Sequence, residues 1–115
     1  MGNLNCIWQG DANESIIMLL DAAEVPAKVT NLTGPETLSV RRIGEYFGAK
    51  FGQKPVFAGE EARTALLNNA SRWHAEHGMP AVSARRVMDW LAHWVEQGLP
   101  TLNKPTHFQT RDGKF

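Results

Sequence analysis

Tyr46 and Lys50 stand four residues apart in the pattern Y-x-x-x-K, the spacing in this sequence best suited to acid–base chemistry. On a helix, this spacing places a lysine one turn from a tyrosine, where its ammonium group can favour the phenolate and make the phenol a general acid/base. We interpret the match as accidental, because no cofactor-binding βαβ unit precedes Tyr46 and no glycine-rich GxGxxG or GxxGxxG turn occurs among the 115 residues. We therefore assign no catalytic residue and no cofactor-binding residue, and we expect Tyr46 to lie on a helix surface.

His74 and His77 are three residues apart, so a helix would place both imidazoles on one face. A metal site needs further ligands, and neither a cysteine nor a well-spaced carboxylate stands nearby to supply them. We predict no metal site and interpret the two histidines as residues of a solvated helix end.

Trp90 and Trp94 lie one helical turn apart and could stack on a sugar or a base. Tryptophan is more often found in a core or at a subunit contact, and we favour that interpretation here. Phe108 and Phe115, in the last ten residues, are the other aromatic candidates for such a contact. We predict these four residues as an interface in a homo-oligomer.

Composition indicates an ordinary small globular protein, with 43% hydrophobic and 21% charged residues. Twelve basic and twelve acidic side chains cancel, so no overall field favours nucleic acid or an anionic membrane. The longest apolar run, Ile16 to Leu20, is too short to cross a bilayer, and the first residues do not have the pattern of a secretory signal. We expect a cytoplasmic protein that has no nucleic-acid or membrane partner. We also expect the single cysteine, Cys6, to be a small buried residue.

Hydrophobic spacing and capping residues predict four helices. The first runs from Asp11 to Ala23 with a capping box between Asp11 and Glu14, and the second is capped by Ser39 and ends near Gly52. Gly44 and Gly48, four apart on this second helix, should let another segment approach closely. The third helix spans Arg72 to His77 before Gly78, and the fourth is capped by Ser83 and ends at Gly98.

Three short apolar runs predict strands: Leu4 to Trp8, Val29 to Leu32 and Val56 to Ala58. A strand, a helix and a strand in succession favour a right-handed parallel crossover. The predicted fold is therefore an α/β (α+β) domain with about four helices and a two- to three-stranded, partly parallel sheet. We place this domain at residues 1–98 and an extended C-terminal tail at residues 99–115.

The segments that carry these elements resemble the C-terminal part of an extended short-chain dehydrogenase/reductase, the NAD-dependent epimerase/dehydratase family. The most specific match is NLTGPETLSVRRIGEYFGAKFGQKPV, which is similar to the strand–turn–helix of that family. Two further segments resemble earlier and later helices of the same family. They are IWQGDANESIIMLLDAA and LLNNASRWHAEHGMPAVSARRVMDWLAHWVEQG, respectively. Arg86 stands where the family often has an acid, so one capping box is not reproduced.

The resemblance implies a small substrate lobe whose cofactor lobe is absent from this chain. In the family, a Rossmann lobe holds NAD(P) and the catalytic residues, while the small lobe closes over a nucleotide-sugar or similar substrate. By this resemblance, the residues that face a substrate are Trp8, Asp11, Glu61, Thr64, Asn68 and Asn69.

Two functions follow as hypotheses. The first is a non-catalytic module that binds a small molecule or takes part in assembly, with no cofactor of its own. The second is a fragment or subunit of an NAD(P)-dependent sugar-nucleotide epimerase/dehydratase-type enzyme, whose Rossmann-type partner lobe lies elsewhere. Hydride transfer needs a positioned nicotinamide, so neither hypothesis gives this chain oxidoreductase activity by itself.

Overall fold

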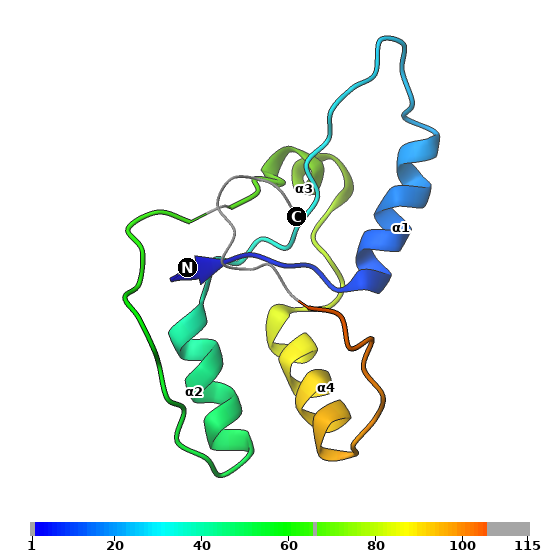
Figure 1. Cartoon of the computed structure of the whole chain (residues 1–115). Helices are drawn as coiled ribbons and strands as arrows, with labels where there is room; N and C mark the ends of the chain where they lie inside the picture. Colours follow the sequence, from blue (N-terminus) through cyan, green and yellow to red (C-terminus); the bar gives the residue numbers. More distant parts are fainter. Residues whose placement is uncertain (1, 66, 106–115) are drawn as a thin grey trace. The chain divides into compact units, whose positions relative to one another are not determined.

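The computed structural model describes residues 2–65 and 67–105. Within these residues the chain forms four helices and two short strands (Figure 1). Their bounds are β1 Asn3–Leu4, α1 Gln9–Leu20, β2 Leu38–Ser39, α2 Val40–Lys50, α3 Ser71–His77 and α4 Ala84–Glu96. The α+β class predicted from the sequence is therefore confirmed.

The sheet is antiparallel, so the predicted partly parallel sheet is wrong. β1 pairs with β2, with Asn3 opposite Ser39 and Leu4 opposite Leu38. The predicted strands at Val29–Leu32 and Val56–Ala58 are absent, and the described residues there lie outside any ladder. Val29 is 88% exposed and Val56 is 93% exposed, so these β-branched side chains lack the packing against neighbouring strands that favours a sheet.

The described chain divides into two compact units. Unit one contains residues 2–4, 38–65 and 88–105, and unit two contains residues 5–37 and 67–87. α4 begins in unit two and continues into unit one, while each other helix and strand belongs to one unit. The predicted division between residues 98 and 99 remains a prediction.

In unit one, α2 follows directly from β2. Ser39 caps it as predicted, because its Oγ accepts a hydrogen bond from the backbone N–H of Arg42 at 3.3 Å. The helix ends before Gly52, whose φ of 63° is one that glycine adopts without strain.

The two glycines of α2 permit the close approach that the sequence predicted. A Cβ atom at Gly44 would lie 2.9 Å from the Phe57 ring, and one at Gly48 would lie 2.6 Å from the carbonyl oxygen of Gln53. The segment after α2 therefore returns along the helix, and the ion pair of Arg41 with Glu61 at 2.6 Å fixes its far end.

In unit two, α1 begins earlier than predicted. The N-cap is Trp8, whose side chain makes no capping hydrogen bond to the helix, so the predicted capping box that begins at Asp11 does not form. Asp11 instead lies inside the first turn, where its carboxylate accepts a hydrogen bond from the backbone N–H of Val82 at 3.0 Å. A hydrogen bond to a residue 71 positions away in the sequence therefore replaces the predicted local contact of Asp11 with Glu14.

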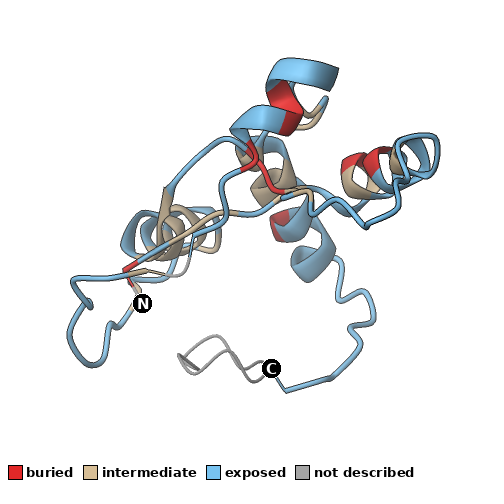
Figure 2. Cartoon of the chain, turned by 90° about the horizontal axis from the view of Figure 1, so that it is seen from above, coloured by how far each residue is buried: buried red, intermediate tan, exposed pale blue. Residues whose placement is uncertain are grey.

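α3 and its N-cap, Ala70, contain both of the buried hydrophobic residues that unit two has among its described residues. Trp73 is 6% exposed and Ala70 is 4% exposed, while the buried polar residues of this unit include Asp11, Thr33 and His74. Figure 2 shows how few positions of the described chain are buried. The expected burial of Cys6 is wrong, since this residue is exposed.

Candidate functional site

Tyr46 and Lys50 both bind Asp89, within unit one. The phenol of Tyr46 donates a hydrogen bond to Oδ1 of Asp89, and Nζ of Lys50 lies 2.9 Å from the same oxygen. α2 presents the tyrosine and the lysine one turn apart, and α4 presents the carboxylate. Tyr46 is partly buried, so it does not lie on an open helix surface as the sequence suggested.

Lys50 has an electrostatic role in this cluster. The hydrogen bond to Asp89, and secondly the contact with Tyr46, raise the pKa of Lys50 above its ordinary value of 10.5. A lysine held in its charged form at neutral pH is neither a base nor a nucleophile. Because the phenol of Tyr46 donates a hydrogen bond to the same carboxylate, the cluster joins α2 to α4.

His74 and His77 have different neighbours. Nε2 of His74 donates to the carbonyl oxygen of Thr33 at 3.0 Å, whereas the ring of His77 stacks on Trp73 with 3.9 Å between centroids. Among the described residues, no group of three or more His, Cys, Asp or Glu side chains could hold a metal ion. The histidines of α3 therefore serve packing and backbone pairing in this unit.

The thiol of Cys6 is poorly suited to act as a nucleophile. Partial desolvation, and secondly the carboxylate of Glu36, raise the pKa of this thiol above its ordinary value of 9.0. At neutral pH the reactive thiolate is therefore scarce.

The clearest candidate for a binding site is a pocket in unit two that we call the Asn68 pocket. Its volume is about 520 Å³. The residues that line it are Asn5, Gly34, Pro35, Thr37, Leu67, Asn68, Asn69, Ala70, Ser71, His74, Ala75 and Met79. None of these described residues is an aspartate, glutamate, lysine or arginine, and several offer amide or hydroxyl groups.

Hydrogen bonds between distant segments build the wall of the Asn68 pocket. Nδ2 of Asn5 donates to the carbonyl oxygen of Asn68 at 2.6 Å, and the backbone N–H of Asn68 donates to Oδ1 of Asn5 at 3.3 Å. Nδ2 of Asn68 donates to the carbonyl oxygen of Leu32 at 3.2 Å. Oδ1 of Asn69 accepts from the backbone N–H of Ser71 at 3.0 Å and so orders the start of α3. The amides thus fix three chain segments around one hollow.

Within unit two, the residues predicted to face a substrate line three different pockets. Asn68 and Asn69 line the Asn68 pocket together. Trp8 lines a smaller pocket of about 250 Å³, and Asp11 lines another of about 240 Å³. Glu61 and Thr64 belong to unit one, where both are exposed and Glu61 pairs with Arg41.

Sequence reasoning missed Asn5, which holds the backbone of Asn68 in place. No local pattern could have indicated this role, because the two residues are 63 positions apart. The interpretation of His74 as part of a solvated helix end is wrong, because its side chain is buried and lines the same pocket.

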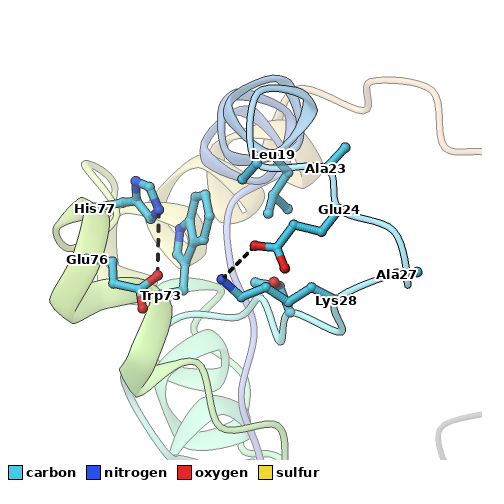
Figure 3. Close-up of a pocket in the computed structure, with 10 residues that line it drawn as sticks. Leu19, Ala23, Glu24, Ala27, Lys28, Trp73, Glu76 and His77 are labelled. Carbon is cyan, nitrogen blue, oxygen red and sulfur yellow. Dashed lines mark ion pairs between the residues drawn. The ribbon is translucent and has the colours of Figure 1, made fainter.

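A second pocket of unit two, which we call the Trp73 pocket, has a volume of about 370 Å³. Figure 3 shows the indole of Trp73 on one side and the pair of Glu24 with Lys28 on the other, with 3.8 Å between the charged atoms of that pair. Glu76 lies beside it and binds Arg72 at 3.0 Å, which lowers the pKa of Glu76 below its ordinary value. These carboxylates are therefore already matched by basic side chains of the same unit.

Trp90 and Trp94 are partly exposed on α4, at 44% and 43%. Nε1 of Trp94 donates to the carbonyl oxygen of Pro100 at 3.0 Å, which ties the residues after the helix to its last turn. Phe108 and Phe115 lie outside the described residues, so the predicted four-residue interface remains a prediction.

The comparisons with known proteins identify no relative. No protein-family description, no curated protein and no solved structure matches this chain. None of the helices in residues 2–65 and 67–105 has the length and apolar character needed to cross a membrane.

Proposed function

We propose that this chain is a non-catalytic, cytoplasmic module that binds a small molecule, of the kind formed by the substrate lobe of NAD-dependent epimerases/dehydratases. The observation that carries this proposal is the Asn68 pocket. Its volume of about 520 Å³ falls within the range of small-molecule sites, roughly 300–1,000 Å³. The resemblance of NLTGPETLS to the family's strand–turn–helix supports the same conclusion, because Gly34, Pro35 and Thr37 line this pocket.

The lining of the Asn68 pocket suits an uncharged, hydroxyl-rich ligand. Asn68, Asn69 and Ser71 bring amide and hydroxyl groups, which exchange hydrogen bonds with hydroxyls, while Leu67 and Met79 supply apolar surface. No Asp, Glu, Lys or Arg is among the described residues that line it, so a separate ionic group of the ligand would find no partner within the pocket. A sugar or the sugar part of a sugar nucleotide has the required chemistry.

The test is a ligand screen on the full chain by native mass spectrometry and calorimetry, with neutral sugars and sugar nucleotides as probes. Ala75→Leu should weaken the binding of any hit about tenfold or more, because the larger side chain enters the pocket. Ala49→Leu is the matched control, since Ala49 is also an exposed helical alanine but lies in α2. A complete absence of hits, or a hit that Ala75→Leu leaves unchanged, would contradict the proposal.

The second candidate is a subunit or fragment that contributes the substrate lobe to an NAD(P)-dependent sugar-nucleotide enzyme. The exposed apolar residues of α1, among them Ile17 at 67% and Leu20 at 72%, favour it, because a lobe that works alone seldom leaves such residues uncovered. A coding sequence for a Rossmann-type domain in the same reading frame would also favour it.

Under both candidates the chain alone neither binds nor reduces NAD(P)+. A glycine-rich turn normally brings backbone amides and a helix N-terminus to the pyrophosphate, and this sequence contains no such turn. Calorimetric titration with NADH and NADP+ should give no heat of binding. Micromolar binding of either nucleotide would show that this expectation is wrong.

A further inference from the structure

α1 buries two of its polar residues and exposes large apolar ones. Asp11 and Ser15 are 6% and 9% exposed, whereas Ile16, Ile17 and Leu20 are 54%, 67% and 72% exposed. We call these three apolar residues the α1 stripe. At positions i, i+1 and i+4 they fall on one face of the helix, opposite to the buried polar pair.

The α1 stripe has the spacing of a docking helix. Amphipathic helices that lie in a groove of a partner use apolar anchors at positions i, i+3 or i+4. In an ordinary surface helix, the apolar face is instead turned toward the core of its own protein. In α1 the buried side chains are those of Asp11 and Ser15, and Asp11 accepts a hydrogen bond from the backbone N–H of Val82. The stripe is thus available to another surface.

One edge of the stripe is acidic. Glu14 and Asp21, seven residues apart, lie one above the other on the side of Ile17, and α1 contains no basic residue. Neither carboxylate forms an ion pair with a residue that the structure describes. Asp21 also stands at the C-cap, where a negative charge opposes the helix dipole, so helix stability does not account for its position.

The acidic edge distinguishes between two possible occupants. In a two-fold antiparallel pairing of α1 with α1 of a second copy, equivalent edges meet, and Glu14 would face Asp21 of the other copy. Such a contact sets like charges against each other. A basic edge on the partner would instead complement both carboxylates.

We propose that the α1 stripe docks into an apolar groove of a different protein chain or domain, bordered on one side by lysine or arginine. This inference goes beyond the proposed ligand binding, because no residue of the stripe lines the Asn68 pocket. The two proposals can therefore fail separately.

The probe is a synthetic amphipathic helix of leucine and lysine, compared with a leucine–glutamate helix of the same pattern, titrated into the full chain at low salt. The Leu/Lys peptide should bind about tenfold or more tightly than the Leu/Glu peptide. Ile17→Asn should remove most of this binding, while Val56→Asn, at a site 93% exposed in unit one, should leave it unchanged. Ile17→Ala serves the same purpose if Ile17→Asn disturbs the fold by circular dichroism.

Charge reversal tests the acidic edge directly. The double variant Glu14→Lys with Asp21→Lys should reverse the preference and favour the Leu/Glu peptide. Equal binding of both peptides by the unmodified chain, or a preference that the reversal leaves in place, would overturn the proposal. A dimer that Ile17→Asn converts to a monomer in sedimentation would overturn it too, because it would make a second copy the occupant. Ala75→Leu should affect sugar binding alone, which separates this result from the fate of the proposed function.

Discussion

Asn68 shows at the residue scale how a predicted ligand contact acquires a structural role. Its side chain and backbone bind Leu32 and Asn5, and these bonds shape the pocket that the side chain was expected to serve. A ligand would therefore meet a wall whose amides are already oriented. Pre-orientation of this kind reduces the entropy that is lost when a ligand binds.

Asn5→Ala should lower the free energy of unfolding by about 1–2 kcal/mol, because it removes two hydrogen bonds to the backbone of Asn68. Asn31→Ala, at an exposed position of the same unit, is the control and should change stability by less than about 0.5 kcal/mol. Urea unfolding measures both. Equal effects would show that the Asn5 contact contributes nothing specific.

Tyr46→Phe should leave the affinity of any ligand of the Asn68 pocket unchanged, since Tyr46 does not line that pocket. It should lower the free energy of unfolding by about 1 kcal/mol, because the hydrogen bond to Asp89 is lost. Calorimetry on a folded variant provides the check. A loss of affinity of about tenfold or more would restore a functional role for the Y-x-x-x-K pair.

Because of Lys50, we expect the free energy of unfolding to depend on pH in alkaline solution. Its pKa is raised in the folded chain, so its contribution is fully present below the pKa of the unfolded chain and disappears as the pH rises through the folded value. The difference in unfolding midpoint between the native chain and Lys50→Met should therefore be constant near neutral pH and vanish at a pH above 10.5. A difference that persists unchanged in strongly alkaline solution would argue against the Asp89 contact.

At the element scale, the Gly-Pro turn is fixed by the contact between two chain segments. The backbone N–H of Gly34 donates to the carbonyl oxygen of Cys6 at 3.1 Å, and a Cβ atom at this position would lie 2.2 Å from that oxygen. The loop before β2 can approach residues 5–8 only because position 34 has no side chain. The close contact with Cys6 thus explains why position 34, the glycine of the segment NLTGPETLS, has no side chain in this protein.

Gly34→Ala should therefore destabilise unit two by roughly 2–4 kcal/mol, since a backbone clash cannot be relieved by rotating a side chain. Gly44→Ala is the comparison, because its Cβ would meet the edge of the Phe57 ring and alanine gains about 1 kcal/mol of helix propensity. Thermal unfolding of both variants should show a much larger loss for the first. A smaller loss at Gly34 than at Gly44 would contradict the contact with Cys6.

At the scale of the whole molecule, the described residues form a small core and leave many apolar side chains exposed. Buried hydrophobic residues among those described are Ala70, Trp73 and Ala92, and no large side chain of the described residues is fully buried. Folding alone therefore leaves much of the hydrophobic surface in contact with water. Association with other surfaces is the expected consequence.

We expect the chain to self-associate through α4, where Trp90 and Trp94 are both partly exposed. Trp90→Glu should shift the equilibrium toward monomer, because a charge placed in an apolar contact must be desolvated. Light scattering of dilute protein, at roughly tens of micromolar, measures the effect, and Ile17→Asn should not reproduce it. A clean monomer at that concentration would rule out this assembly.

Local patterns in the sequence were sufficient to predict much of the helical structure. Ser39, Gly52, Gly78 and Gly98 mark helix ends by capping and backbone chemistry that acts over a few residues, so α2, α3 and α4 lie close to where they were predicted. The glycine face of α2 was predictable for the same reason, since Gly44 and Gly48 fall on one side of the helix.

Only the tertiary structure decided which segments meet. The strand predicted at Val29–Leu32 does not form, because a strand depends on a partner whose identity no local pattern contains, and the chain pairs Asn3–Leu4 with Leu38–Ser39 instead. Asp11 forms a hydrogen bond with the backbone of Val82 in place of the predicted capping box. Asn68 is held by Asn5, which is 63 residues away in the sequence. Contacts of this range depend on the whole folded backbone, and they, not the local sequence, form the Asn68 pocket.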